Sequence, residues 1–213
     1  MAEITPVAAA GLTTEPPKPV FMRPKSGHPS APKITECPTL TEGTRYLVII
    51  ETQIGDTEAY VELLYLLNNA KDNDIVHIKI RTPGGSILTG MTIINAMLTT
   101  KAFLITEATG ECASMGTGIW AAGDEIRMGR WGSVMFHSAS HGDNGKSLSI
   151  MENAANVISF FNFYNDDIAV KRGLLTEEEH LRLSTDKIDM FLDYDTMAPR
   201  LASLKHSSEW RRG

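Results

Sequence analysis

The stretch "IVHIKIRTPGGSILTGMTIINAMLTTKAFLITEAT", residues 75–109, decides the fold class. It begins with an alternating apolar segment, 75–81, that predicts a strand, and then enters the turn "TPGGS". Apolar residues at helical spacing follow over 87–100, and the apolar run 102–109 predicts a second strand. A strand, a helix and a strand in this order form a unit with parallel strands. The sequence therefore predicts an α/β fold with its functional loops at the carboxyl ends of the strands.

The alternation of strands and helices continues on both sides. Residues 45–52 predict a strand, and Asp56 is a candidate cap for the helix that follows it. That helix has apolar residues at helical spacing, namely Leu63, Leu66, Leu67 and Ala70. On the carboxyl side, the sequence predicts a short helix over 114–123 and strands over 124–129 and 133–137.

The last third of the chain predicts two more helices. A long one covers roughly 147–172, and its broad apolar face suits burial between subunits as well as against its own core. Gly173 is its candidate C-cap. Thr176 and Glu179 have the spacing of a capping box, which predicts the start of another helix.

Composition limits the classes of function. A chain of 213 residues with 42% hydrophobic residues suits one globular domain, and a net charge of −6 with scattered Lys and Arg argues against a nucleic-acid partner. Eight of the ten prolines fall within the first 38 residues, which predicts a flexible or extended arm over 1–40 and a folded domain over 41–213. The arm is either a leader without a role or a segment that packs on a neighbouring subunit.

Cysteine usage and hydropathy predict a cytoplasmic protein. Cys37 and Cys112 are too few for a disulfide framework, and neither has metal-ligand spacing, so no metal or cofactor is expected. The first residues lack the pattern of a secretory signal. No apolar run reaches the roughly 18 residues that cross a membrane, so no membrane partner is expected either.

The segment "ECASMGTGIWAAG", residues 111–123, places Ser114 among small residues at a strand-to-helix turn. Such a turn exposes the hydroxyl, and the helix that follows offers free backbone N–H groups to an oxyanion. Ser114 is therefore either a nucleophile or only the N-cap of that helix. In "TPGGS", Gly84 and Gly85 serve either a tight turn or the close approach of a ligand.

A nucleophilic serine needs a base and a carboxylate that orients the base. His137 closes the predicted strand 133–137, 23 residues after Ser114, and is the preferred base. His141 falls in a polar loop, and His77, in mid-strand, is expected to be structural. Spacing does not choose among the candidate carboxylates, which are Asp186, Asp189, Asp193 and Asp195.

Taken together, these segments resemble the ClpP family of self-compartmentalising serine peptidases. The matching motifs are "TPGGS", "ECASMGTGIWAAGDEIRMG", "SVMFH" and "TDKIDMF", in the family's order and with near-family spacing over roughly 45–192. The resemblance implies a crotonase-like fold of stacked beta-alpha-beta units with flanking helices. It also implies a handle over 141–172, whose long helix joins two stacked rings.

The resemblance assigns a role to each candidate by position. The family's catalytic serine, histidine and aspartate fall on Ser114, His137 and Asp189, and the backbone oxyanion donors fall on Gly85 and Met115. The implied protein is an ATP-dependent Clp-type serine endopeptidase that cleaves unfolded polypeptides inside a homo-oligomeric ring assembly. An ATP-driven unfoldase is a candidate partner.

Several features differ from the family. After His137 the chain reads "SASHGDNGK", without the usual glutamine and proline, and after Phe191 the usual closing helix is not expected. These differences leave open a motor-independent protease that matures phage capsids and a catalytically inactive assembly subunit. An acyl-CoA enzyme of the crotonase type and a nucleophilic Cys112 are further alternatives.

Overall fold

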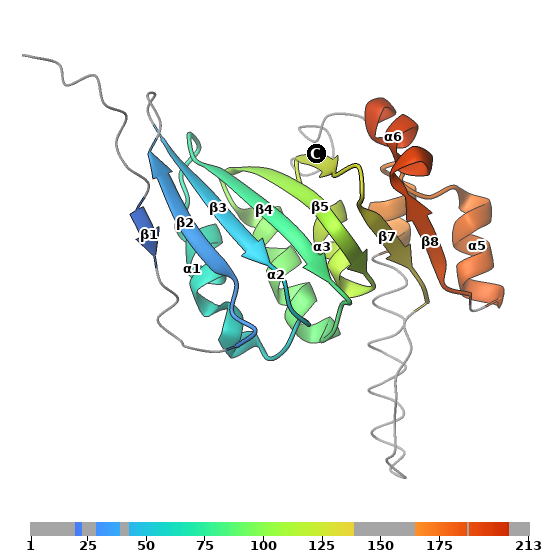
Figure 1. Ribbon diagram of the computed structural model, residues 1–213, viewed down its shortest axis with the longest axis horizontal. Helices are drawn as coiled ribbons and strands as arrows, with labels where there is room; N and C mark the ends of the chain where they lie inside the picture. The colour runs from blue at the N-terminus through green and yellow to red at the C-terminus, as the bar shows by residue number, and fades with distance from the viewer. Residues whose placement is uncertain (1–19, 23–28, 39–42, 139–164, 187, 205–213) are drawn as a thin grey trace, which may run out of the picture.

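The computed structural model has a mixed α/β fold, and it describes residues 20–22, 29–38, 43–138, 165–186 and 188–204. Within these residues, eight strands form one sheet (Figure 1). Their bounds are β1 Val20–Met22, β2 Lys33–Pro38, β3 Thr44–Ile50, β4 Ile75–Thr82, β5 Phe103–Ala113, β6 Glu125–Met128, β7 Ser133–Phe136 and β8 Met190–Asp193. The order along the sheet is β1-β2-β3-β4-β5-β7-β8, and β6 pairs with β5 off this path.

The pairing directions place the carboxyl ends of the central strands at one edge. β3, β4 and β5 are parallel, and both β6 and β7 pair in parallel with β5. β2 is antiparallel to β1 and β3, and β8 is antiparallel to β7. β6 pairs with residues Ile105–Ala108 of β5, whereas β7 pairs with Glu111–Ala113. The end of β7 therefore lies beside the turn that follows β5.

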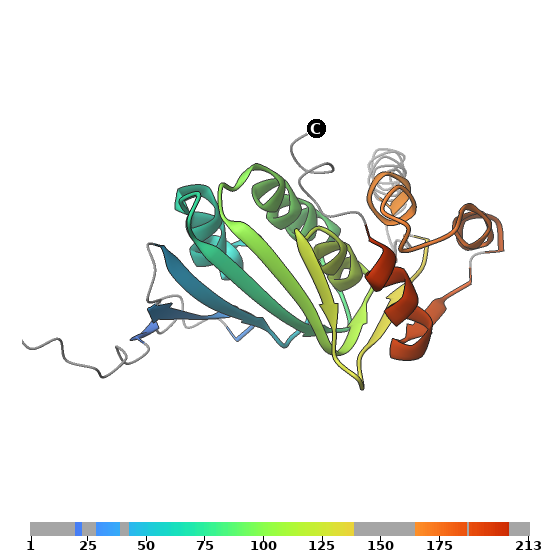
Figure 2. The ribbon, with the colours of Figure 1, turned by 90° about the horizontal axis from the view of Figure 1, so that it is seen from above.

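Helices cover one face of this sheet (Figure 2). They are α1 (Val61–Asn69), which follows the 3-10 turn η1 (Thr57–Tyr60), α2 (Ile87–Thr99) and α3 (Met115–Ala121). Val76, Ile78 and Ile80 of β4 belong to the core and have no exposed surface, as expected for every second residue of a strand covered on one face. The predicted parallel α/β arrangement is confirmed.

The chain between β7 and β8 contains η2 (Asn165–Val170), a turn of π-helix, and α5 (Glu177–Asp186), and α6 (Tyr194–Ser203) follows β8. No helix within the described ranges is long and apolar enough to span a bilayer.

The structure confirms two of the three predictions of helix capping. Gly173 has φ of 80° and ends the turn of η2, as a C-cap glycine does. Thr176 and Glu179 form the predicted capping box: Glu179 N donates to Thr176 Oγ1 at 3.1 Å, and Thr176 N donates to Glu179 Oε2 at 2.8 Å. Asp56 takes the N-cap position of η1, but its side chain makes no capping hydrogen bond.

Two sequence expectations need correction, and one lies outside the described residues. Two segments inside the predicted arm, β1 and β2, are paired strands of the sheet rather than flexible chain. A helix, α6, does follow Phe191, because Asp193 caps it by accepting from Thr196 N at 2.9 Å. Of the predicted handle over 141–172, the structure describes only residues 165–172. The domain boundary near residue 40 stays a prediction.

An ion pair joins the last two helices. Arg200 of α6 donates from Nη1 and Nη2 to the two carboxylate oxygens of Glu179 on α5, both at 2.7 Å. The Arg200 hydrogen bonds are the main cause that lowers the pKa of Glu179 to about 2. Such a two-point contact between charged groups fixes the orientation of both side chains, so it holds α6 against α5.

Glu179→Gln is therefore expected to lower the free energy of unfolding by about 1–3 kcal/mol at pH 7. Because the pKa of Glu179 is depressed, the stabilisation is present above the ordinary carboxyl pKa and is lost as the pH falls toward about 2. Urea denaturation at several pH values measures both effects. The exposed neighbour Glu178→Gln should change stability by less than about 0.5 kcal/mol. Equal losses in the two variants would contradict this account.

Candidate active site

The turn between β5 and α3 holds Ser114 in an unusual backbone conformation. Its φ and ψ are 53° and −123°, and it is the one non-glycine residue in the described ranges with a positive φ. The Ser114 N–H donates to the carbonyl oxygen of Met135 in β7 at 2.9 Å. Its own carbonyl accepts from the amides of Thr117 and Gly118. This sharp strand-to-helix turn presents the side chain outward from the end of the sheet.

The Ser114 hydroxyl bonds to a histidine rather than capping its helix. Ser114 occupies the N-cap position of α3, but its side chain makes no capping hydrogen bond. Its Oγ lies 2.6 Å from Nε2 of His137, the residue that follows β7. With Nε2 unprotonated, the hydroxyl donates to it, so this contact fits a serine whose proton is accepted by a neutral imidazole.

Burial favours that neutral imidazole. The His137 side chain is 17% exposed, and its loss of solvation is the main cause that lowers its pKa. The nearby Asp189 charge acts in the opposite direction and raises the pKa of His137. The net lowering keeps His137 unprotonated at neutral pH, which is the form that accepts a proton.

Asp189 lies on the other side of His137. Pairing of β7 with β8 sets Phe136 against Met190, and the next position in each direction sets His137 opposite Asp189. Asp189 Oδ1 is 3.9 Å from His137 Nδ1, and the aspartate side chain is 60% exposed. This distance is an ion-pair contact but too long for a hydrogen bond.

The other candidates have different partners. Asp193 caps α6, Asp195 pairs with Arg130 at 3.4 Å, and Asp186 pairs with Arg182 at 3.9 Å. His77 is buried in mid-sheet with Nε2 at 2.9 Å from Glu107 Oε2, as expected for a structural histidine. His141 lies outside the described residues.

The glycine turn lies against the serine turn. A Cβ added to Gly84 would lie 2.6 Å from Ser114 Cβ, and Gly84 has φ of 98°. Gly85 has φ of 144°, and its added Cβ would lie 2.1 Å from the carbonyl oxygen of Ile54. The backbone of Ile54 makes two hydrogen bonds to this turn. Ile54 N donates to Gly84 O, and Ser86 N donates to Ile54 O, each at 2.8 Å. Close approach therefore requires both glycines.

Two backbone amides near these turns have no acceptor among the described residues. In the described part of the chain, neither Gly85 N–H nor Met115 N–H donates a hydrogen bond to another group. The Met115 side chain is fully buried and packs where Gly90 of α2 leaves room for it. At the start of α3, Met115 can therefore offer a ligand its amide but not its side chain.

Sequence reasoning missed two residues that build this site. The backbone of Ile54 holds the glycine turn, and no local pattern reveals a bridge between a loop and a turn. Thr117, inside the small-residue run of α3, bonds to two strands through its hydroxyl. A hydroxyl among glycines and alanines was a visible signal, but the sequence does not say which carbonyls it reaches.

Cys112 is excluded as a nucleophile. Its side chain has no exposed surface, and burial raises the pKa of its thiol well above the usual range. The reactive thiolate is therefore disfavoured. Among the described residues, no group of three or more His, Cys, Asp or Glu side chains is arranged to hold a metal ion.

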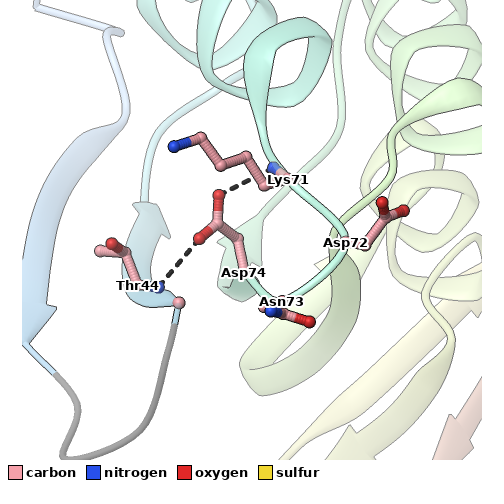
Figure 3. Close-up of a pocket in the computed structure, with 6 residues that line it drawn as sticks. Thr44, Lys71, Asp72, Asn73 and Asp74 are labelled. Atoms are coloured by element: carbon pink, nitrogen blue, oxygen red, sulfur yellow. Dashed lines mark hydrogen bonds between the residues drawn. The ribbon is translucent and has the colours of Figure 1, made fainter.

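A hollow of about 400 Å³ lies at the opposite end of the strands (Figure 3). It is lined by residues just before β3 and β4, including Lys71 and Asp74. The Asp74 carboxylate accepts from Thr44 N and Lys71 N, each at 2.8 Å. These bonds satisfy a buried acid at a loop, so Asp74 has a structural role.

Gly84→Ala is expected to lower the free energy of unfolding by more than about 2 kcal/mol, because the added methyl meets the Ser114 turn and the φ is strained. Urea denaturation measures the loss. Gly55→Ala is the matched control, since its added Cβ would meet its nearest neighbour at 3.6 Å. Its stability should change by less than about 0.5 kcal/mol. A Gly84→Ala protein as stable as wild type would contradict the described contact of the two turns.

A family model matches most of this chain. Residues 43–191, well over half of the chain, match the family model for Clp protease. This range contains the glycine turn, Ser114, His137 and Asp189. The family has a crotonase-like fold, which agrees with the mixed α/β sheet described above. The chain therefore belongs to the Clp protease family, which implies serine peptidase activity on polypeptides.

Proposed function

We propose that this chain is a serine endopeptidase in which Ser114 is the nucleophile, His137 the general base and Asp189 the residue that orients the base. The observation that carries the proposal is the 2.6 Å contact between Ser114 Oγ and His137 Nε2. An N-cap serine would bond to its own helix instead. Ser114 does not, and its strained turn directs the hydroxyl to the imidazole.

The reaction is acyl transfer. The neutral imidazole of His137 takes the hydroxyl proton as Ser114 Oγ attacks a peptide carbonyl, and the imidazolium then gives that proton to the leaving amine. Water, deprotonated by the same imidazole, hydrolyses the acyl-enzyme and frees Ser114. The depressed pKa of His137 supports this role, because the base must be unprotonated before attack.

The Gly85 and Met115 amides form the oxyanion hole in this proposal. Both amides lack an acceptor in the described residues, and the two turns that carry them are in contact at Gly84 and Ser114. Fixed N–H donors stabilise the negative charge that develops on the carbonyl oxygen during attack. Each such donor is worth about 10²–10³-fold in rate.

Asp189 needs to move closer to act at full strength. At 3.9 Å from His137 Nδ1 it attracts the imidazolium, but it does not fix the ring by a hydrogen bond. Catalytic contacts are often long before substrate binds and shorten in the complex. We infer that substrate binding or assembly closes this gap by about 1 Å.

The wider context of this activity stays a set of predictions. A cytoplasmic location is predicted from cysteine usage and hydropathy. Unfolded polypeptides as substrates, stacked homo-oligomeric rings and an ATP-driven unfoldase partner stay predictions from the resemblance. So do the two variants of the role, a motor-independent capsid-maturation protease and an inactive assembly subunit. The acyl-CoA alternative needs neither Ser114 nor His137, so their close contact favours the peptidase.

Ser114→Ala should abolish both labelling by a fluorophosphonate probe and cleavage of fluorescein-labelled unfolded casein. Loss of activity by about 10³-fold or more is expected, because the nucleophile itself is removed. Ser184→Ala, on the exposed face of α5, is the control and should behave as wild type. A wild-type protein that stays unlabelled would favour the inactive subunit. Turnover of an acyl-CoA thioester that survives Ser114→Ala would favour the crotonase alternative.

The pH dependence of labelling tests the roles of His137 and Asp189. Burial lowers the pKa of His137, so the acid limb of the rate should have its midpoint below pH 6.5. Asp189 raises that pKa, so Asp189→Asn should move the midpoint to still lower pH and also slow the reaction. If the gap closes as inferred, the loss should approach the roughly 10⁴-fold of a hydrogen-bonded aspartate, and a much smaller loss would show that the gap stays open.

Asp186→Asn, whose partner is Arg182, is the control for this titration. It should leave both the midpoint and the rate unchanged. If the Asp186→Asn profile shifts and the Asp189→Asn profile does not, Asp186 rather than Asp189 orients the base, and the proposed assignment is wrong.

A further inference from the structure

Thr117 connects the helix that follows Ser114 to two strands. It lies on α3, and its side chain is 1% exposed. Thr117 Oγ1 lies 2.7 Å from the Cys112 carbonyl oxygen of β5 and 2.9 Å from the Met135 carbonyl oxygen of β7. The single hydroxyl proton is shared between these two acceptors. Thr117 thus bonds to both strands near the point where the pairing of β5 with β7 ends.

The Met135 carbonyl joins both halves of the site. It accepts from Ser114 N at 2.9 Å and from Thr117 Oγ1 at 2.9 Å. Met135 is also on β7, and His137 directly follows that strand, two residues further on. One oxygen atom therefore ties the Ser114 turn and α3 to the strand that ends at the base.

We propose that Thr117 is a positioning residue: its hydroxyl fixes the distance between Ser114 and His137. This inference rests on the proposed function of that pair. Within the described residues, two hydrogen bonds tie the start of α3 to β7 besides the Ser114–His137 contact itself, and Thr117 makes one of them. The other comes from the Ser114 backbone, which a side-chain substitution cannot remove.

Loss of the hydroxyl should act on rate more than on binding. Valine has the shape of threonine without the donor, so Thr117→Val leaves the Cys112 carbonyl without this buried donor and removes one of the two hydrogen bonds that tie the start of α3 to β7. Displacement of a catalytic group by about 1 Å can cost 10²-fold in rate. A tenfold or larger loss is therefore expected in kcat and in the rate of labelling, while KM stays nearly unchanged.

A purely structural role makes a different prediction, and Thr106 provides the comparison. Thr106 of β5 has no exposed surface and donates from Oγ1 to the Trp120 carbonyl oxygen at 2.6 Å, near the other end of α3. It is the same residue type, with the same kind of buried bond to the same helix, but without a link to β7. Thr106→Val should lower the Tm comparably and keep labelling within about twofold of wild type.

The experiment compares Thr117→Val, Thr117→Ser and Thr106→Val in the full-length protein. Tm is measured first, and fluorophosphonate labelling and peptide kcat and KM follow at a temperature well below the lowest Tm. Thr117→Ser keeps the donor and should restore labelling to within about threefold of wild type. Should Thr117→Val fail to fold, Thr117→Cys replaces it, with slower labelling expected from its weaker thiol donor.

Two results would overturn the proposal: Thr117→Val labelled as fast as wild type, or Thr106→Val slowed as much as Thr117→Val. Failure of Thr117→Ser to restore the rate would also count against a role for the hydroxyl. An unlabelled wild type is a separate outcome, because it would refute the proposed function itself.

Discussion

The backbone turn at Ser114 is the constraint around which the site is built. An L-amino acid at φ of 53° and ψ of −123° is held in a sparsely populated region, which costs about 1–3 kcal/mol and persists only where neighbours enforce it. The neighbours here are the Met135 carbonyl, the buried helix α3 and the glycine turn. The small residues around Ser114 follow from this crowding. Gly116, for example, has no room for a Cβ beside Thr82.

The same residue in the same place could have been a plain helix cap, and hydrogen bonding separates the two roles. A cap is satisfied by its own helix, whereas this hydroxyl is committed to His137. The neighbouring thiol shows the opposite case. Cys112 is near in sequence but points into the core, where burial suppresses its ionisation. Ser114 differs from Cys112 in that its side chain is partly exposed at the turn, and being near the turn in sequence does not make a side chain reactive.

The sequence predicts the features that depend on residues close together in the chain. It does not predict those that depend on pairing between distant strands. β4, α2 and β5 follow from hydrophobic periodicity, and the position of His137 follows from the end of a strand. Asp189 could not be chosen by spacing, since only the pairing of β7 with β8 brings it opposite the imidazole. β2 falls inside the predicted arm because the prolines around it hide a strand, although it pairs with β1 on one side and with β3 on the other. The helix α6 was missed because Pro199 interrupts its pattern.

The antiparallel pair of β7 and β8 has a consequence for control of the site. β8 spans four residues, so few ladder bonds fix its alignment with β7. Side chains alternate between the faces of a strand, so a slip of one residue would replace the carboxylate with Ile188 or Met190 and turn the acid to the far side. The place of the carboxylate beside the imidazole therefore depends on the alignment of these four residues with β7.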